Sequence, residues 1–211
     1  MTDSARTAHA SSPPAWTIPL GIAVWIVVFA WRPANFWLLM TLGAGGLGLC
    51  ALRIRGAFPK EEGVGVYDAI AGGAAAALLY AIFALGRPVI GGLIPDASSQ
   101  IGNLYALRAQ APGWAIVLLL IAIIGPGEEL FWRGLVQWGL VRRWGAGAGW
   151  AAATALYGGA HVAAANTVLV VAALVAGGFW GLLYLRLGRI APLIVSHILW
   201  DLAVFFLAPL R

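Results

Sequence analysis

Seven apolar stretches alternate along the chain with short polar connections. Since a helix needs roughly 20 mainly apolar residues to cross a bilayer, this pattern predicts an all-α, polytopic transmembrane helical bundle of about seven or eight spans. Tryptophans stand at several edges of the stretches, where the indoles of membrane proteins usually meet the interface. The stretches are residues 16–31, 36–52, 66–85, 113–143, 149–165, 168–187 and 190–208.

The fourth stretch is longer than one span requires. As a single helix, residues 113–143 would be ~46 Å long at ~1.5 Å per residue, which exceeds the hydrocarbon core. We therefore expect this helix to be tilted, kinked at Gly125-Pro126-Gly127 or extended past the interface. In the longest connection, 86–111, the portion from Ser98 to Gln110 can form either a surface helix or part of a gate, and the pattern does not choose between them.

Composition places the chain in lipid. Hydrophobic residues make up 62% and charged residues 10% of the 211 residues, whereas about one quarter of a soluble domain is charged. The net charge of +5 comes from short basic clusters between apolar stretches. Such clusters indicate loops that face anionic lipid, so membrane lipids are the expected partners and nucleic acid is not.

The basic residues also predict an orientation. With seven spans and a cytoplasmic N-terminus, the inside holds Arg6, Arg53, Arg55, Lys60, Arg142, Arg143, Arg186 and Arg189, and the outside holds Arg32, Arg87, Arg108 and Arg211. This excess follows the positive-inside rule. We expect an integral protein of a bacterial-type plasma membrane with its N-terminus in the cytoplasm.

Three polar groups interrupt the apolar stretches, and ionisable side chains inside membrane spans are costly and usually functional. Each group contains a pair at positions i and i+4, so its members share one helix face. Each of three helices therefore presents a polar stripe. The pairs are Glu129 and Arg133, with Glu128 beside them, then Tyr157 and His161, and finally His197 and Asp201.

The three stripes are expected at similar depth. At ~1.5 Å per residue, Glu129 lies ~21 Å before Arg143, His161 ~17 Å after Trp150, and His197 and Asp201 ~12 Å and ~18 Å after Arg189. The stripes can thus form one cluster in the cytoplasmic half of the bilayer.

Such a cluster suits the activation of water. A buried glutamate can take a proton from water and return it to a leaving amine. One histidine can hold that water, and a second can donate to the oxyanion of a tetrahedral intermediate. The adjacent Glu128 and Glu129 point about 100° apart on a helix, so we expect one to face the site and the other to be structural, paired with Arg133.

The same residues resemble the motifs of the CPBP family, which contains the CAAX-prenyl-protease-2-like and bacteriocin-processing (Abi) intramembrane proteins. Glu128-Glu129-Leu130-Phe131-Trp132-Arg133 resembles the motif EExxxR. Tyr157 to His161 resembles FxxxH with Tyr in place of Phe, and His197 to Asp201 resembles HxxxN or HxxxD in its Asp form. Order and spacing agree over roughly 112–208.

The resemblance implies an intramembrane endopeptidase that cleaves membrane-associated peptides or proteins, including lipidated or membrane-anchored ones. By analogy, Glu128 and His161 would activate the water, His197 and Asp201 would serve the oxyanion, and Glu129, Arg133 and Tyr157 would support them. The division that follows is a flexible N-terminal tail (1–15), N-terminal transmembrane helices with a long connecting loop (16–111) and a catalytic transmembrane core (112–208).

The sequence does not decide whether the site uses a metal ion. There is no HExxH zinc signature. A catalytic zinc typically needs three protein ligands, and His161 and His197 with either Glu128 or Asp201 could supply them across helices. We favour chemistry without a cofactor and keep zinc as the alternative.

Two other classes of function compete with the peptidase. A proton-coupled transporter also keeps Glu, His and Asp side chains inside the membrane. A proteolytically silent scaffold or immunity protein could use the same fold. Small residues such as Gly158, Gly159, Gly177 and Gly178 could admit a peptide from the side, although tight helix contact is their commoner role.

Overall fold

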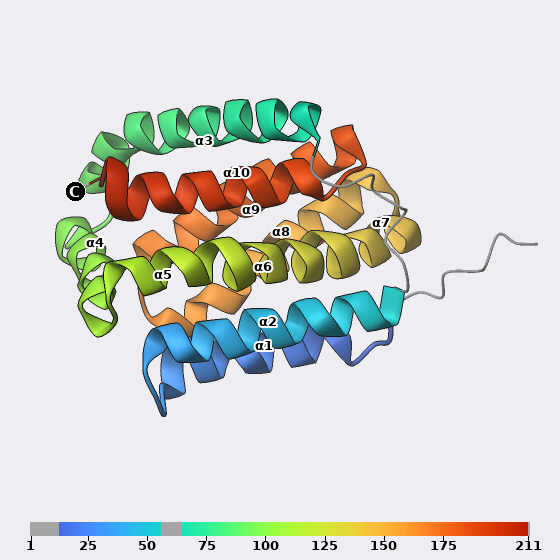
Figure 1. Cartoon of the computed structure of the whole chain (residues 1–211), viewed down its shortest axis with the longest axis horizontal. Helices are drawn as coiled ribbons and strands as arrows, with labels where there is room; N and C mark the ends of the chain where they lie inside the picture. The colour runs from blue at the N-terminus through green and yellow to red at the C-terminus, as the bar shows by residue number, and fades with distance from the viewer. Residues whose placement is uncertain (1–12, 56–64, 211) are drawn as a thin grey trace, which may run out of the picture.

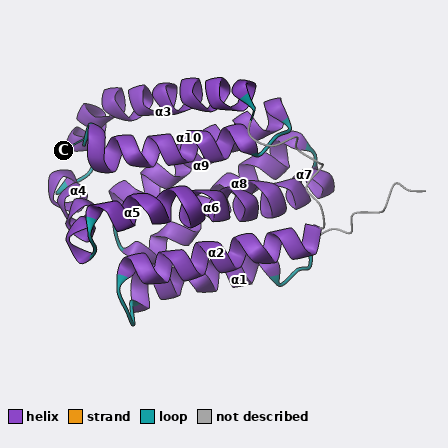
Figure 2. Ribbon diagram, viewed as in Figure 1, coloured by secondary structure: helices purple, strands orange, loops and turns teal. Residues whose placement is uncertain are grey.

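The computed structural model describes residues 13–55 and 65–210, and every regular element within them is helical (Figures 1 and 2). The all-α prediction is therefore confirmed. Most of the predicted tail, together with Arg6, Lys60 and Arg211, lies outside the described residues.

Ten α-helices are described, and short turns of other helix types extend or join them. The helices are α1 (Thr17–Ile26), α2 (Phe36–Arg55), α3 (Val66–Leu93), α4 (Ala97–Ala106), α5 (Gly113–Leu119), α6 (Gly125–Phe131), α7 (Trp138–Trp144), α8 (Ala146–Ala160), α9 (Thr167–Leu187) and α10 (Ala191–Leu202). Turns of π-helix occupy Val27–Trp31, Leu120–Ile124, Trp132–Gln137 and Ala203–Leu207, and 3-10 turns occupy Leu107–Gln110 and His161–Ala164.

Each predicted apolar stretch corresponds to one helical rod. Four rods are long and apolar enough to cross a membrane: Phe36–Arg55, Val66–Leu93, Gly113–Trp144 and Thr167–Leu187. The rods Thr17–Trp31 and Ala191–Leu207 are apolar but shorter. The chain is thus an integral membrane protein with a helical bundle, in which four described rods reach full spanning length.

The connection 86–111 is mostly helical. Helix α3 passes Pro88 and ends at Leu93, beyond the predicted end at 85. Helix α4 and the 3-10 turn Leu107–Gln110 take up most of the remainder. The loop expected between the third and fourth stretches is therefore replaced by the end of α3 and a short separate helix.

The glycines around Pro126 bring helices close together on two sides of α6. A Cβ atom on Gly48 of α2 would lie 2.8 Å from the Cα atom of Gly127, and one on Gly125 would lie 3.1 Å from the Ile198 side chain of α10. Pro126 directly follows the π-helical turn Leu120–Ile124, and the rod Gly113–Trp144 continues past it without ending. The motif Gly125-Pro126-Gly127 thus lets α2 and α10 approach the helix that carries Glu128 and Glu129.

One end of the bundle gathers several basic helix ends. The end of α2, the start of α3, α7 and the junction between α9 and α10 lie together at the right of Figure 1. Arg55 Nη1 donates to the Gly134 carbonyl at 2.7 Å, and the Arg189 guanidinium contacts both carboxylate oxygens of Asp68 at 2.8 Å. Helix α4 and the C-terminus lie at the opposite end.

Candidate active site

Glu129 of α6 has two buried partners, Arg133 on the same rod and His197 on α10. Arg133 Nη1 donates to Glu129 Oε1 at 2.9 Å, and His197 Nδ1 lies 2.7 Å from the same oxygen. Glu129 is 0% exposed. The i and i+4 pairing of Glu129 with Arg133 was predicted, whereas the contact with His197 was not.

The neighbouring glutamate has different partners. The Tyr157 hydroxyl on α8 donates to Glu128 Oε2 at 2.8 Å. The Arg133 guanidinium lies over the Tyr157 ring, 4.5 Å from its centroid. The two adjacent glutamates therefore diverge as expected: Glu129 is enclosed by Arg133 and His197, and Glu128 is held by Tyr157.

His161 stands at the end of α8 with a partner at each ring nitrogen. Nδ1 lies 2.7 Å from the Tyr157 carbonyl oxygen, and Nε2 lies 3.3 Å from Nε1 of Trp25. A carbonyl oxygen only accepts and an indole N–H only donates. The hydrogen-bond network therefore assigns the ring proton to Nδ1 and the lone pair to Nε2.

His197 is oriented from three sides. Glu129 holds Nδ1, and Nε2 lies 3.6 Å from Asp201 Oδ2, which is too long for a hydrogen bond. The Trp180 ring stacks on the imidazole with a centroid distance of 4.1 Å and an interplanar angle of 20°. Trp180 is itself fixed, because its Nε1 donates to Ser196 Oγ at 3.1 Å.

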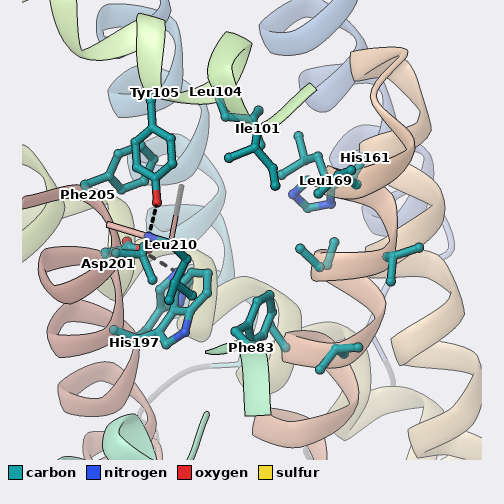
Figure 3. A pocket seen from close by; sticks show the side chains of 18 of the residues that line it. Phe83, Ile101, Leu104, Tyr105, His161, Leu169, His197, Asp201, Phe205 and Leu210 are labelled. Carbon is teal, nitrogen blue, oxygen red and sulfur yellow. Dashed lines mark hydrogen bonds and ion pairs between the residues drawn. The ribbon is translucent and has the colours of Figure 1, made fainter. Parts of the chain in front are cut away.

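Five of the predicted site residues line one cavity of about 450 Å³: Glu128, Tyr157, His161, His197 and Asp201. Glu129 and Arg133 are buried beside it. Figure 3 shows His161 on one side of the cavity, with His197 and Asp201 on the other. The remaining lining is mostly aliphatic and aromatic, so the polar groups form a small patch in an apolar chamber.

Helix α4 covers one side of this cavity with Ile101, Leu104 and Tyr105 (Figure 3). Hydrogen bonds fasten it to neighbouring elements. The Gln100 carbonyl accepts from Asn166 Nδ2 at 2.9 Å, and the Tyr105 hydroxyl accepts from the backbone N–H of Leu210 at 2.9 Å. The segment that the sequence left undecided thus forms a wall of the cavity.

Gly158 of α8 and Gly177 of α9 serve helix contact. A Cβ atom on Gly177 would lie 2.8 Å from Cδ1 of Tyr157, and one on Gly158 would lie closer still to the Leu174 side chain. Gly159 has open space around it. Gly177 therefore allows Tyr157 to pack closely against α9 with its hydroxyl at Glu128, and we assign no peptide entrance to Gly158 or Gly177.

The donor groups do not form a preassembled zinc site. Within residues 13–55 and 65–210, no group of three His, Cys, Asp or Glu side chains is arranged to hold a metal ion. Both nitrogens of His161 already have protein partners, and Nδ1 of His197 faces Glu129. Glu128, His161 and His197 therefore do not fit a common metal as they are placed, and no step below passes through one.

The fold and the cavity define an integral membrane protein with a buried acid and histidine site. Residues 110–203 match the family model described as "Type II CAAX prenyl endopeptidase Rce1-like". This match covers all three motifs and confirms the resemblance to the CAAX-protease-like family of intramembrane endopeptidases. No curated protein and no solved structure matches the chain.

Sequence reasoning missed two aromatic residues of the site. Trp25 lies outside the matched segment and reaches His161 from α1. Trp180 carries no charge and stands in an ordinary apolar stretch. The only signal for either was a tryptophan in the middle of a span rather than at its edge, where indoles are usually found.

Proposed function

We propose that the chain is an endopeptidase that cleaves membrane-associated peptides or proteins with water activated by Glu128 and His161. The observation that carries the proposal is that Glu128, His161 and His197, from three different helices, face the same apolar cavity. A carboxylate and two imidazoles in a chamber of low polarity can move protons without competition from bulk water.

Glu128 acts as the base in the proposed reaction. Tyr157 holds Oε2, and we assign Oε1 to the attacking water. Glu128 takes one proton as the water oxygen bonds to the peptide carbonyl carbon. The same proton then passes to the leaving amine nitrogen as the C–N bond breaks, so the glutamate ends in its starting state.

His197 serves the oxyanion. With Nδ1–H directed to Glu129, a proton on Nε2 can be donated to the tetrahedral intermediate. Asp201, near that nitrogen, balances the charge of the ring before substrate arrives. Fixed donors directed at developing charge are usually the largest single contribution to such a reaction. Glu129, Arg133 and Tyr157 are positioning residues.

The substrate is a peptide or protein with an apolar part that enters from the membrane, because most of the cavity lining is aliphatic or aromatic. Lipidated or membrane-anchored chains have this character. We also propose that the N-terminus lies in the cytoplasm. The basic ends of α2, α7 and α9 lie at one end of the bundle (Figure 1), as the positive-inside rule requires.

The test is cleavage of a lipidated reporter peptide by the purified protein in vesicles. Glu128→Gln keeps the shape of the side chain and removes the base, so cleavage should fall by about 10²–10⁴ while thermal unfolding stays unchanged. Glu62→Gln, a glutamate outside the three motifs, is the matched control. A Glu128→Gln variant with wild-type cleavage overturns the proposal.

A chelator arm addresses metal dependence. Cleavage that resists a chelator supports the metal-free form, and loss that zinc restores supports the alternative. A transporter would instead show proton or solute flux in the same vesicles, altered by Glu128→Gln. A scaffold would keep its function in Glu128→Gln, His161→Ala and His197→Ala.

A further inference from the structure

Trp25 of α1 forms a hydrogen bond with one of the motif residues, His161. Among the described residues, it is the one hydrogen bond recorded between α1 and a motif side chain. Its side chain is 0% exposed, and its Nε1 lies 3.3 Å from Nε2 of His161. The indole packs edge-on against both the His161 ring and Trp132, with centroid distances of 6.1 Å and 5.7 Å. A buried indole with these neighbours has little freedom to turn.

The lone pair at this contact is the one that the proposed reaction needs. Nδ1 of His161 carries its proton toward the Tyr157 carbonyl, so Nε2 is the only ring nitrogen that can accept a hydrogen bond from water. The indole N–H already donates to Nε2. Trp25 and the attacking water therefore compete for a single acceptor.

We propose that Trp25 is a positioning residue that occupies the His161 lone pair in the substrate-free protein. It keeps Nε2 as the acceptor of the ring, and water can bind this nitrogen only when the hydrogen bond from the indole is broken. This inference rests on the proposed function for its catalytic meaning, but the contact itself can be tested without any cleavage. Helix α1, which lies outside the matched family segment, would thus control the reactivity of His161.

The chain offers a matched control in Trp132. It is also buried, at 2% exposure, and lies in edge-to-face contact with Trp25. Neither tryptophan lines the cavity, and the indole Nε1 of Trp132 has no hydrogen-bond partner among the described residues. Replacing either tryptophan with phenylalanine removes the same atoms, but only the change at Trp25 removes a donor to His161.

The experiment measures carbethoxylation of His161 by diethylpyrocarbonate, which reacts with the imidazole lone pair. The full-length protein is treated in vesicles, and modified peptides are quantified by mass spectrometry with His9, the histidine outside the three motifs, as the internal reference. A hydrogen bond contributes about 0.5–1.5 kcal/mol, so Trp25→Phe should raise the His161 rate roughly threefold to tenfold. Trp132→Phe should leave the rate within about twofold of wild type.

A second variant covers the case in which Trp25→Phe fails to fold. Benzothienylalanine at position 25 keeps the shape of the indole and replaces only N–H with sulfur, so it should give the same rise. An unchanged His161 rate in this variant, or an equal rise in Trp132→Phe, overturns the proposal.

Peptide cleavage by the same samples is a separate readout. At low substrate concentration, Trp25→Phe should raise kcat/KM about threefold to tenfold, because no hydrogen bond from the indole has to be broken before water binds Nε2. A decrease in kcat/KM counts against the competition. If wild type cleaves no peptide, the proposed function fails while the carbethoxylation result still decides whether Trp25 occupies His161.

Discussion

The two sides of the cavity hold their histidines in opposite ways. His197 lies among charges: Glu129 at Nδ1, Asp201 near Nε2 and Arg133 bound to the same glutamate oxygen. His161 has a backbone carbonyl and an indole as its hydrogen-bond partners. In low polarity, carboxylates stabilise a protonated ring, whereas neutral partners leave a ring that accepts hydrogen bonds.

We call the side of the cavity that holds His197, Glu129 and Asp201 the donor wall, and the side that holds His161 and Tyr157 the acceptor wall. The donor wall suits the donation of a proton or hydrogen bond to an oxyanion, and the acceptor wall suits the acceptance of a hydrogen bond from water. Glu128 lies on α6, next to Glu129 of the donor wall, but it is held by Tyr157 of the acceptor wall. It therefore stands where the two walls meet.

The largest expected effect is on the free energy of unfolding, when Glu129 of the donor wall loses its arginine. Arg133→Met should lower the free energy of unfolding by about 3–5 kcal/mol, because it leaves the buried Glu129 without its arginine. Arg143→Met, at an exposed arginine of α7, should change it by about 0.5 kcal/mol or less. Denaturant titration of the protein in detergent measures both, and equal changes would contradict the buried ion pair.

Next comes the contrast between the two histidines. His197→Gln should lower kcat by about 10²–10³, as loss of an oxyanion donor does. His161→Gln should lower it by only about tenfold, because the water keeps its contact with Glu128. Steady-state cleavage of the reporter peptide gives both values. Equal losses would remove the distinction between the donor and acceptor walls.

Tyr157→Phe tests the point where the walls meet. Loss of a hydrogen bond to a charged group costs about 1.5–3 kcal/mol, so kcat should fall at least about tenfold. The effect should vanish in a Glu128→Gln background, because both changes act on one contact. Tyr80→Phe, which removes a hydroxyl bonded to the Ala208 carbonyl, should leave kcat unchanged.

Two adjacent glycines give a smaller effect. A Cβ atom on Gly177 would lie 2.8 Å from the Tyr157 ring, whereas one on Gly178 would lie 3.6 Å from Thr154, an ordinary contact. Gly177→Ala should therefore lower the free energy of unfolding by about 1–3 kcal/mol and reduce cleavage, as overpacking does. Gly178→Ala should change neither. If Gly177→Ala changes neither the free energy of unfolding nor cleavage, Tyr157 is not held by α9.

The smallest effect is expected at Asp201. Its Oδ2 lies 3.6 Å from His197 Nε2, too far for a hydrogen bond, and an amide keeps an oxygen of the same shape. Asp201→Asn should change kcat by no more than about threefold, since Glu129 still orients His197 through Nδ1 and still balances the charge of the ring. A loss comparable to that of His197→Gln would assign the orienting role to Asp201 instead.

The sequence by itself determined the helices and the faces that carry polar groups. Apolar length predicted seven rods, and the i and i+4 spacing predicted that Glu129 would pair with Arg133 on one helix, as the 2.9 Å contact shows. Both are local properties: helix length and side-chain direction follow from the rise and twist of one helix. The division of roles between Glu128 and Glu129 followed from the same geometry.

Only the tertiary structure decided which partners each polar group has across helices. The contacts of His197 with Glu129, of Tyr157 with Glu128 and of Trp25 with His161 join residues 29 to 136 positions apart. They depend on the rotation of each helix about its axis and on how closely the helices approach. Close contacts such as those at Gly127 and Gly177 set these quantities, because packing between side chains, unlike helix spacing, is not written in any single segment.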